Sequence, residues 1–146
     1  MQDRFKFRVW NKLANVMTYN VCFGNFELKT GETMSNKIDW IGVDYNKPET
    51  FICFKDTLIK DLELMQCTGL KDKNGKLIYE GDFVKCGKFI YRVAYDNIKF
   101  ASFVLIRTNE LEMFKHYFGE AVDSEDVEII GNIYETPDLL TESEEQ

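Results

Sequence analysis

Two carboxylates, Glu80 and Asp82, flank Gly81 within the stretch "LIYEGDFV". Residues two apart in a β-strand project from the same face, so these side chains would reach one metal ion or one sugar. They are candidate acid–base groups of a hydrolase. Acidic residues beside a turn glycine also accept hydrogen bonds from backbone amides. The sequence favours this structural role over catalysis.

The stretch "KDKNGKLIYE" begins like a calcium-binding loop but does not continue as one. If Asp72 and Asn74 took positions one and three, Gly75 would take position four instead of six. Position twelve, which needs a bidentate glutamate, would be Phe83. Asn74-Gly75 instead predicts a two-residue hairpin turn, because both residue types accept positive φ. We therefore expect Asn74, Gly75 and Gly81 to be structural turn residues.

Histidine and cysteine are too few and too scattered for a zinc site or a nucleophile. The only histidine is His116, and Cys22, Cys53, Cys67 and Cys86 form no C-x-x-C pair. A structural zinc site needs four thiolate or imidazole ligands, usually in close pairs. The sequence therefore predicts no metal and no cofactor, and assigns the cysteines to buried apolar positions.

A second kind of chemistry is the binding of nucleic acid by a small barrel. Aromatic side chains on a curved sheet stack on bases, and nearby cations neutralise phosphates. Residues of these types lie in the C-terminal half: Tyr79, Tyr91, Arg92, Tyr95, Lys99 and Phe100. The same aromatics could instead form the core. The candidate binding residues are Tyr79, Glu80, Asp82, Tyr91, Arg92 and Lys99.

Alternation of apolar and polar residues predicts strands in most of the chain. It indicates strands in 4–10 and 16–23 with a turn at "NKLAN" between them, in 39–43, and in 126–135, and a strand ending near Thr68. It also indicates strands within 83–96 and 98–108, with hairpin turns at Gly87-Lys88 and Asp96-Asn97. Apolar spacing also predicts one helix over 109–118. The fold class is therefore mainly β, with an SH3-like or curled small barrel in the C-terminal half. We expect an N-terminal β-rich extension over 1–60, the barrel over 61–136 and an acidic tail over 137–146.

Charge is unevenly distributed along the chain. The net charge is −7, yet residues 119–146 hold ten of the 25 acidic residues and no lysine or arginine. The rest of the chain is slightly basic, without a basic stripe. No apolar run is long enough to span a membrane, and the N-terminus lacks the apolar region of a signal peptide. These features predict a cytoplasmic protein with no membrane partner.

The chain resembles the YopX family of phage and prophage proteins. The resemblance is carried by "TGLKDKNGKLIYEGDFV", preceded by "FKFRVW" and "LELMQCTGLKD" and followed by "VEIIGNIYETPDLL". It implies a mostly β protein with a small C-terminal barrel, encoded by a phage or prophage and acting in the host bacterial cytosol. It carries over no catalytic residues.

These observations favour a non-enzymatic protein–protein interaction or assembly module. Self-association through exposed strand edges is one route to such a role. The alternatives are a nucleic-acid-binding small β-barrel and a hydrolase that uses Glu80 and Asp82.

Overall fold

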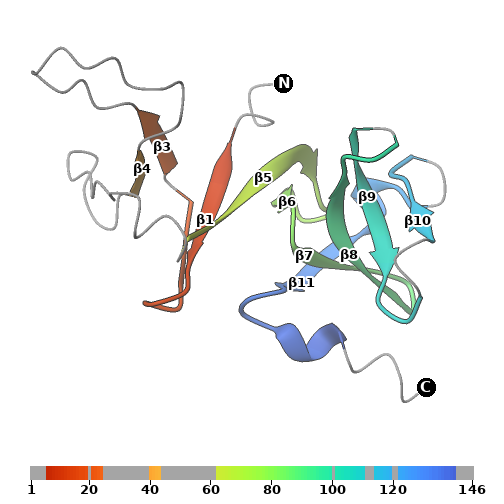
Figure 1. The fold of residues 1–146 in the computed structure, drawn as a ribbon. Helices are drawn as coiled ribbons and strands as arrows, with labels where there is room; N and C mark the ends of the chain where they lie inside the picture. Colours follow the sequence, from red (N-terminus) through yellow and green to blue (C-terminus); the bar gives the residue numbers. More distant parts are fainter. Residues whose placement is uncertain are drawn as a thin grey trace, which may run out of the picture. The chain divides into compact units, whose positions relative to one another are not determined.

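The computed structural model describes residues 6–19, 21–24, 40–43, 62–99, 101–110, 114–119 and 122–140. The regular elements in these ranges are eleven strands and two short 3-10 helices (Figure 1). This composition confirms the predicted mainly β fold class. Within the same ranges, no helix is long and apolar enough to cross a membrane.

The chain divides into two compact units, which we describe separately. One unit is residues 6–65, and the other is residues 66–146 together with residues 1–5. The boundary lies inside strand β5 (Leu62–Lys71).

In the unit of residues 6–65, β1 (Phe7–Asn11) and β2 (Val16–Thr18) form an antiparallel hairpin. The predicted turn at "NKLAN" is confirmed, because the Asn11 side-chain oxygen accepts hydrogen bonds from the Leu13 and Ala14 amides at 3.0 and 3.1 Å. The strand predicted over 16–23 is divided into β2 and β3 (Val21–Gly24). Strand β3 pairs with β4 (Trp40–Val43) instead of with β1.

The alternation in "RFKFRVW" predicts one buried and one exposed face, and this prediction is wrong. Arg8, Val9 and Trp10 are all buried. Val9 belongs to a small core that also contains Leu62 and the half-buried Val21. When both faces of a strand are buried, alternation in its sequence does not tell which side chains face solvent.

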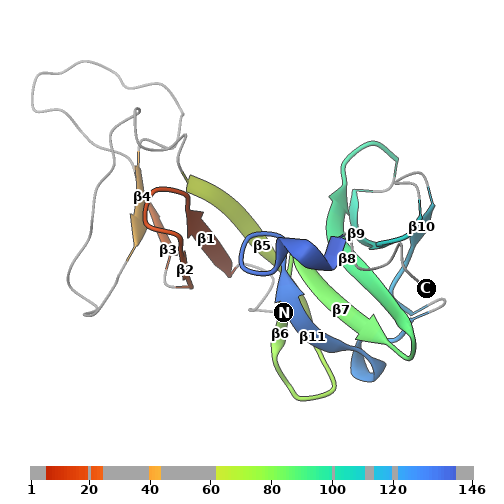
Figure 2. The same ribbon diagram turned by 90° about the horizontal axis from the view of Figure 1, so that it is seen from below.

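In the unit of residues 66–146, five antiparallel strands form a curled sheet in the order β10-β9-β8-β7-β11 (Figure 2). Their bounds are Asp82–Cys86 for β7, Phe89–Asp96 for β8, Ser102–Arg107 for β9, Lys115–His116 for β10 and Glu128–Asn132 for β11. The later part of β5 pairs with β6 (Leu77–Tyr79). Strand β5 continues to Lys71, beyond the predicted end near Thr68, because the β5–β6 pairing extends to Lys71 and Leu77.

The turn between β7 and β8 follows directly from its residues. Cys86 pairs with Phe89, so only Gly87 and Lys88 connect the strands. Gly87 has φ of +57°, whereas Lys88 does not have positive φ. This pattern fits a type II′ turn, whose first central position favours glycine.

The core of this unit lies against one face of the sheet. It is formed by aliphatic and aromatic side chains from β6 to β9 and from the segment before β11: Ile78, Val84, Tyr91, Val93, Leu105, Val122 and Val127. Cys67, which is fully buried, and the half-buried Cys86 are free thiols. Cys53 and the side chain of Cys22 lie outside the described residues.

The helix predicted over 109–118 is wrong for the residues that the structure describes there. Lys115 and His116 form β10 and pair with Ile106 and Leu105 of β9. Phe118 forms an isolated bridge with Val122. The spacing of Phe114 and Phe118 is compatible with a helix as well as with the observed structure. A strand forms here because residues of this segment pair with the edge of β9.

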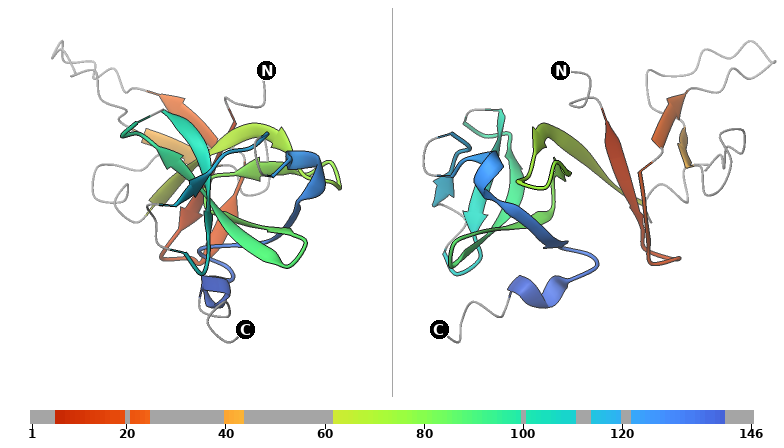
Figure 3. Two further views of the ribbon diagram at one scale, coloured as in Figure 1. Left: turned by 90° about the vertical axis from the view of Figure 1, so that its right-hand side faces the viewer. Right: turned by 180° about the vertical axis from the view of Figure 1, so that it is seen from behind.

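Strand β11 contains an irregularity between Ile129 and Gly131, where its register against β7 shifts. A β-carbon on Gly131 would collide with Thr136 Oγ1. That hydroxyl accepts a hydrogen bond from the Asn132 amide at 2.9 Å. Glycine therefore lets the chain fold back after β11, ahead of the 3-10 helix η3 (Pro137–Leu140) (Figure 3).

Candidate functional site

Glu80 and Asp82 belong to a tight turn between β6 and β7. The Asp82 carboxylate is buried, and its Oδ2 atom accepts a hydrogen bond from the Tyr79 amide at 2.8 Å. The Glu80 amide donates to the Gln66 carbonyl at 2.9 Å. The two carboxylates therefore do not project from one strand face, because Glu80 is in the turn and Asp82 begins β7. This geometry favours a structural role for Asp82.

Gly81 is held on both sides by distant strands. It has φ of +84°, a conformation that favours glycine. Its amide donates to the Val93 carbonyl at 2.8 Å, and its carbonyl accepts from the Ile133 amide at 2.9 Å. The turn thus links β8 with the segment that follows β11.

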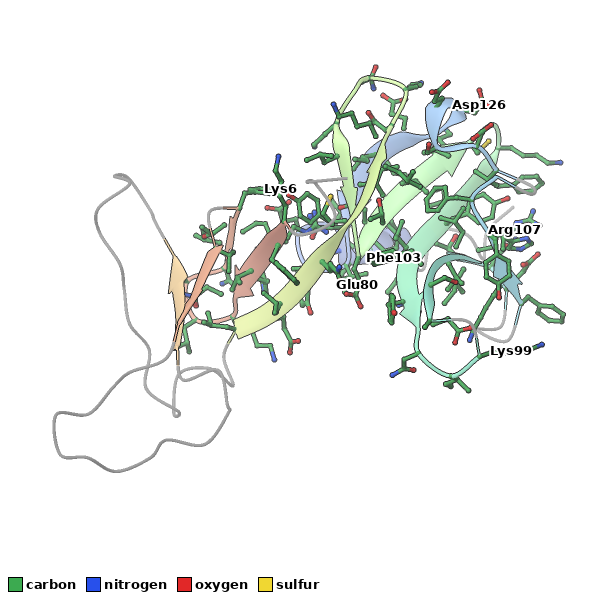
Figure 4. The ribbon with its side chains drawn as sticks, turned by 90° about the horizontal axis from the view of Figure 1, so that it is seen from above. Lys6, Glu80, Lys99, Phe103, Arg107 and Asp126 are labelled. Atoms are coloured by element: carbon green, nitrogen blue, oxygen red, sulfur yellow. The ribbon has the colours of Figure 1, made fainter. Side chains whose placement is uncertain are left out.

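The six candidate binding residues do not form one surface. Tyr79 and Tyr91 are only 5% and 6% exposed, so neither ring is available for stacking on a base. Tyr91 and Arg92 are adjacent in β8 and point to opposite faces. Lys99 lies at the tip of the β8–β9 hairpin, away from Glu80 (Figure 4). Phe100 lies outside the described residues.

The hairpin that contains Asn74 and Gly75 has a longer turn than predicted. Its loop runs from Asp72 to Lys76, and the Asp72 amide donates to the Lys76 carbonyl at 2.8 Å. Gly75 has φ of +77°, but Asn74 does not have positive φ. A turn over 72–75 that ends in a glycine with positive φ is typical of hairpin loops longer than two residues.

Asp72 organises this loop. Its Oδ1 atom accepts hydrogen bonds from the Asn74 and Lys76 amides at 2.9 Å each, and its Oδ2 atom accepts one from the Ile129 amide at 3.1 Å. Burial alone would raise the Asp72 pKa, but these three amides outweigh it and the pKa is lowered. The Lys73 amide donates to the Val127 carbonyl at 2.9 Å, so the loop is fixed to the start of β11.

Sequence reasoning missed a group of polar and aromatic side chains near the start of β8 and the end of β9, away from the turn that joins them. We call it the Arg107 cluster: Phe89, Tyr91, Arg107, Glu110 and His116. The Arg107 guanidinium carbon lies 3.5 Å from the centre of the Phe89 ring. Glu110 accepts a hydrogen bond from Arg107 and lies 3.0 Å from His116 Nε2, whose ring packs edge-on against Tyr91 at 5.6 Å.

The electrostatics of this cluster hold Glu110 in its charged form. The hydrogen bonds from His116 and Arg107 lower the Glu110 pKa, against the opposing effect of burial. Burial raises the pKa of Tyr91. The β8–β9 register pairs Tyr91 with Arg107, so a correct register would have predicted that these two residues are neighbours. His116 joins them because β10 pairs with β9, and the sequence did not predict β10.

The end of the β8–β9 hairpin presents apolar side chains to solvent. We call it the β8–β9 tip and define it as Tyr95, Ile98, Lys99 and Phe103. Ile98 is 88% exposed, and Tyr95 is 42% exposed with its ring packed edge-on against Phe103 at 5.2 Å. Large apolar side chains that are exposed at the end of a hairpin, such as Tyr95 and Ile98, are typical of a binding surface.

The base of this tip is anchored by Asp96. Its Oδ1 atom accepts hydrogen bonds from Lys115 Nζ at 2.9 Å and from the Ile98 amide at 3.2 Å. The bond from Lys115 is the main reason that the Asp96 pKa is lowered. Ala101 on the other side has φ of +48°, which is uncommon for a residue with a β-carbon. The base of the tip is therefore connected to β10 through Asp96 and Lys115.

A shallow hollow of about 350 Å³ lies beside the Arg107 cluster. We call it the arginine hollow; its lining residues are Arg92, Ile106, Arg107, Thr108, Glu110, Ile133 and Leu140. Across the described ranges, no three histidine, cysteine, aspartate or glutamate side chains are grouped so that they could hold a metal ion. The lining combines two arginines and the acidic Glu110 with aliphatic residues, and Arg107 is already paired with Glu110.

Three comparisons with known proteins place the chain among its relatives. A family model described as YopX protein matches residues 6–141. The structure is similar to that of protein EF1440 from Enterococcus faecalis, with 27% identity, a TM-score of 0.56 and coverage of 92% of this chain and 96% of that chain. It is also similar to protein yopX from Bacillus subtilis, with 18% identity, a TM-score of 0.57 and coverage of 94% and 96%. The search of curated proteins found no match.

Proposed function

The chain belongs to the YopX family, and from this premise we propose that it is a non-enzymatic protein–protein interaction module. We propose further that it is encoded by a phage or prophage and acts in the bacterial cytosol. The resemblance of its central motif to that family supports the phage origin, and the two similar structures come from bacterial proteins. Mapping the gene's neighbours tests the origin: phage structural or replication genes on both sides are expected, and a conserved housekeeping operon would contradict it.

The observation that carries the proposed function is the exposure of Ile98 at 88% beside Tyr95 at 42%. Burying an aliphatic or aromatic side chain of this size against a partner stabilises a complex by about 1.5–3 kcal/mol. Interfaces concentrate their binding energy in a few such anchors. The ion pair between Asp96 and Lys115 anchors the base of the tip, which reduces the ordering cost of binding.

The alternatives have weaker support. Base stacking by a small barrel needs accessible aromatic rings, and the burial of Tyr79 and Tyr91 removes two of the expected platforms. A hydrolase using Glu80 and Asp82 needs a carboxylate that can contact substrate, whereas Asp82 is buried and bound to the Tyr79 amide. We therefore propose that the partner is a protein with an apolar pocket for Ile98 and acidic groups near Lys99.

A photo-reactive amino acid at position 98 tests this proposal in the bacterial host. We expect light-dependent adducts that are degraded by protease and resist nuclease. The matched control carries the same group at Lys85, an exposed residue of β7. An adduct of twice the chain's mass would identify self-association. Nuclease-sensitive adducts, or equal adducts at both positions, would contradict the proposal.

A further inference from the structure

We propose that the base of the β8–β9 tip holds one buried water molecule between Asp96 Oδ2 and Ser102 Oγ. Both oxygens are buried, and neither has a hydrogen-bond partner within the described part of the chain. The proposal concerns how the tip is built. It does not depend on the partner proposed for the tip.

The first argument is position. Asp96 and Ser102 are directly paired in the β8–β9 register, at the last pair before the hairpin loop. Side chains of a directly opposed pair lie on the same face of a sheet, with their β-carbons about 4.5–5.5 Å apart. The two oxygens therefore belong to neighbouring side chains that do not bond to each other. A polar pair separated in this way is a common place for a bridging water.

The second argument is burial. Asp96 is only 3% exposed, and the hydroxyl oxygen of Ser102 is also shielded from solvent. Bulk water therefore reaches neither oxygen. Buried polar groups in folded proteins nearly always have a partner, and an ordered internal water commonly supplies it. One such molecule satisfies both oxygens.

The third argument is the match of donors and acceptors. Asp96 is ionised, because the hydrogen bond from Lys115 lowers its pKa, so Oδ2 needs a donor. The Ser102 hydroxyl can donate as well as accept. A water molecule that donates to Oδ2 and accepts from this hydroxyl completes both groups. The Lys99 amide also favours the ionised carboxylate, but it forms no hydrogen bond with Oδ2.

A metal ion fits this place less well than water. Lys115 Nζ lies 2.9 Å from the other carboxylate oxygen, Oδ1, and already balances the charge of Asp96. Asp96 and Ser102 supply one carboxylate and one hydroxyl, whereas calcium and magnesium take about six or more oxygen ligands. The bound molecule is therefore neutral.

The water extends a chain of contacts across three strands. It joins Ser102 of β9 to Asp96 of β8, and the Asp96 carboxylate continues the connection to Lys115 of β10. The Ile98 amide donates to the same carboxylate at 3.2 Å. The attachment of the tip to its sheet thus depends on a solvent molecule as well as on the chain.

A crystal structure of the full-length protein tests the proposal directly. We expect one ordered water within about 2.5–3.0 Å of both Asp96 Oδ2 and Ser102 Oγ. In solution, NMR should show a negative nuclear Overhauser effect between this water and the β-protons of Asp96, which marks a long-lived buried water. A direct hydrogen bond to Oδ2 from Ser102 or from the Lys99 amide would overturn the proposal. A water on only one of the two oxygens, or on neither, would do the same.

Ser102→Ala removes one of the two groups that hold the water. We expect the Overhauser effect on Asp96 to disappear and the melting temperature to fall by about 3–8 °C. Ser102→Thr keeps the hydroxyl and should retain both properties. The matched control is Ser124→Ala, at a half-buried serine of the 3-10 helix η2 (Ser124–Asp126), which should change neither. If Ser102→Ala leaves the effect on Asp96 unchanged, Ser102 does not hold the water and the proposal is wrong.

Discussion

The Asp72 carboxylate accepts a hydrogen bond from the Ile129 amide at 3.1 Å, although the two residues are 57 positions apart. This bond fixes the loop of the β5–β6 hairpin to β11, and the Lys73 amide and the Val127 carbonyl reinforce it. The motif around Asn74-Gly75 is thus a connection between the middle and the end of the chain as well as a turn.

Removing one oxygen of Asp72 should weaken this connection. We expect Asp72→Asn to lower the free energy of unfolding by about 1–3 kcal/mol. The new N–H₂ group replaces one of the two acceptor oxygens, so either the Ile129 amide or the two loop amides lose their acceptor. Urea denaturation measures the change. The control is Asp123→Asn, an exposed acid, which should have little effect. A loss for Asp72→Asn no larger than that of the control would contradict this role.

Acid should destabilise the protein through the same carboxylate. The pKa of Asp72 is lowered below its ordinary value of 3.8 in the folded protein, so its stabilising effect is complete above that value. The effect is lost as pH falls through the lower, folded-state pKa. Glu110 and Asp96, whose pKa values are also lowered, act in the same direction.

Denaturation measured between pH about 5 and about 2 should therefore show falling stability. The decline should be shallower for Asp72→Asn than for the unmodified protein. Parallel curves for the two proteins would mean that Asp72 does not contribute to the acid dependence.

Gly75 is required for its backbone conformation and not for space. A β-carbon there would meet no atom within 4 Å, but φ is +77°. We expect Gly75→Val to destabilise the fold by at least about 1–2 kcal/mol, because a β-branched residue resists positive φ. Gly75→Asn should cost less, since asparagine tolerates this region. Equal thermal melting of the two variants would show that conformation is not the cause.

Asp82 and Glu80 should differ when replaced singly. Asp82→Ala leaves the Tyr79 amide without its acceptor and should lower stability by about 1–3 kcal/mol. Glu80→Ala, at a more exposed position, should cost at most about 1 kcal/mol. Calorimetric melting compares them. If Asp82→Ala melted normally while a biological activity disappeared, a functional site at this turn would be supported instead.

The two ends of the C-terminal region should respond differently to deletion. Deleting residues 141–146 should leave the melting temperature nearly unchanged, because β11 and its pairing with β7 are kept. Deleting residues 126–146 removes β11 and its pairing with β7, and also the Ile129 amide that Asp72 binds. Circular dichroism should then show no cooperative transition. A cooperative, native-like melt after the longer deletion would contradict this expectation.

Local sequence signals predicted the elements that depend on neighbouring residues. The turns at Gly87-Lys88 and at residues 12–15 follow from their residue types, and the fold class follows from repeated alternation. The signals failed where a distant partner decides the outcome. β10 forms because the edge of β9 is available, and Arg8 is buried although it lies on the polar face of its alternation.

The candidate site shows the same division. Sequence identified the turn around Gly81 but could not show that Asp82 is buried. Burial depends on distant parts of the chain, and the bonds of Gly81 to Val93 and Ile133 show that such parts meet at this turn. It passed over His116, whose neighbours Glu110 and Tyr91 come together only through the β8–β9–β10 pairing. A single histidine without a local motif gives no signal of such a group.

The late position of β11 in the chain has a consequence for biosynthesis. Residues emerge from the ribosome in order, so β7 can pair with β8 while the edge that β11 will cover still has unpaired backbone groups. Asp72 has two of its three amide partners during that interval and lacks the one from Ile129. An open strand edge on a nascent chain is a template for association with other chains. Slow translation of the last twenty or so codons should therefore favour aggregation, and co-production of a chaperone that shields strand edges should favour recovery of the folded protein.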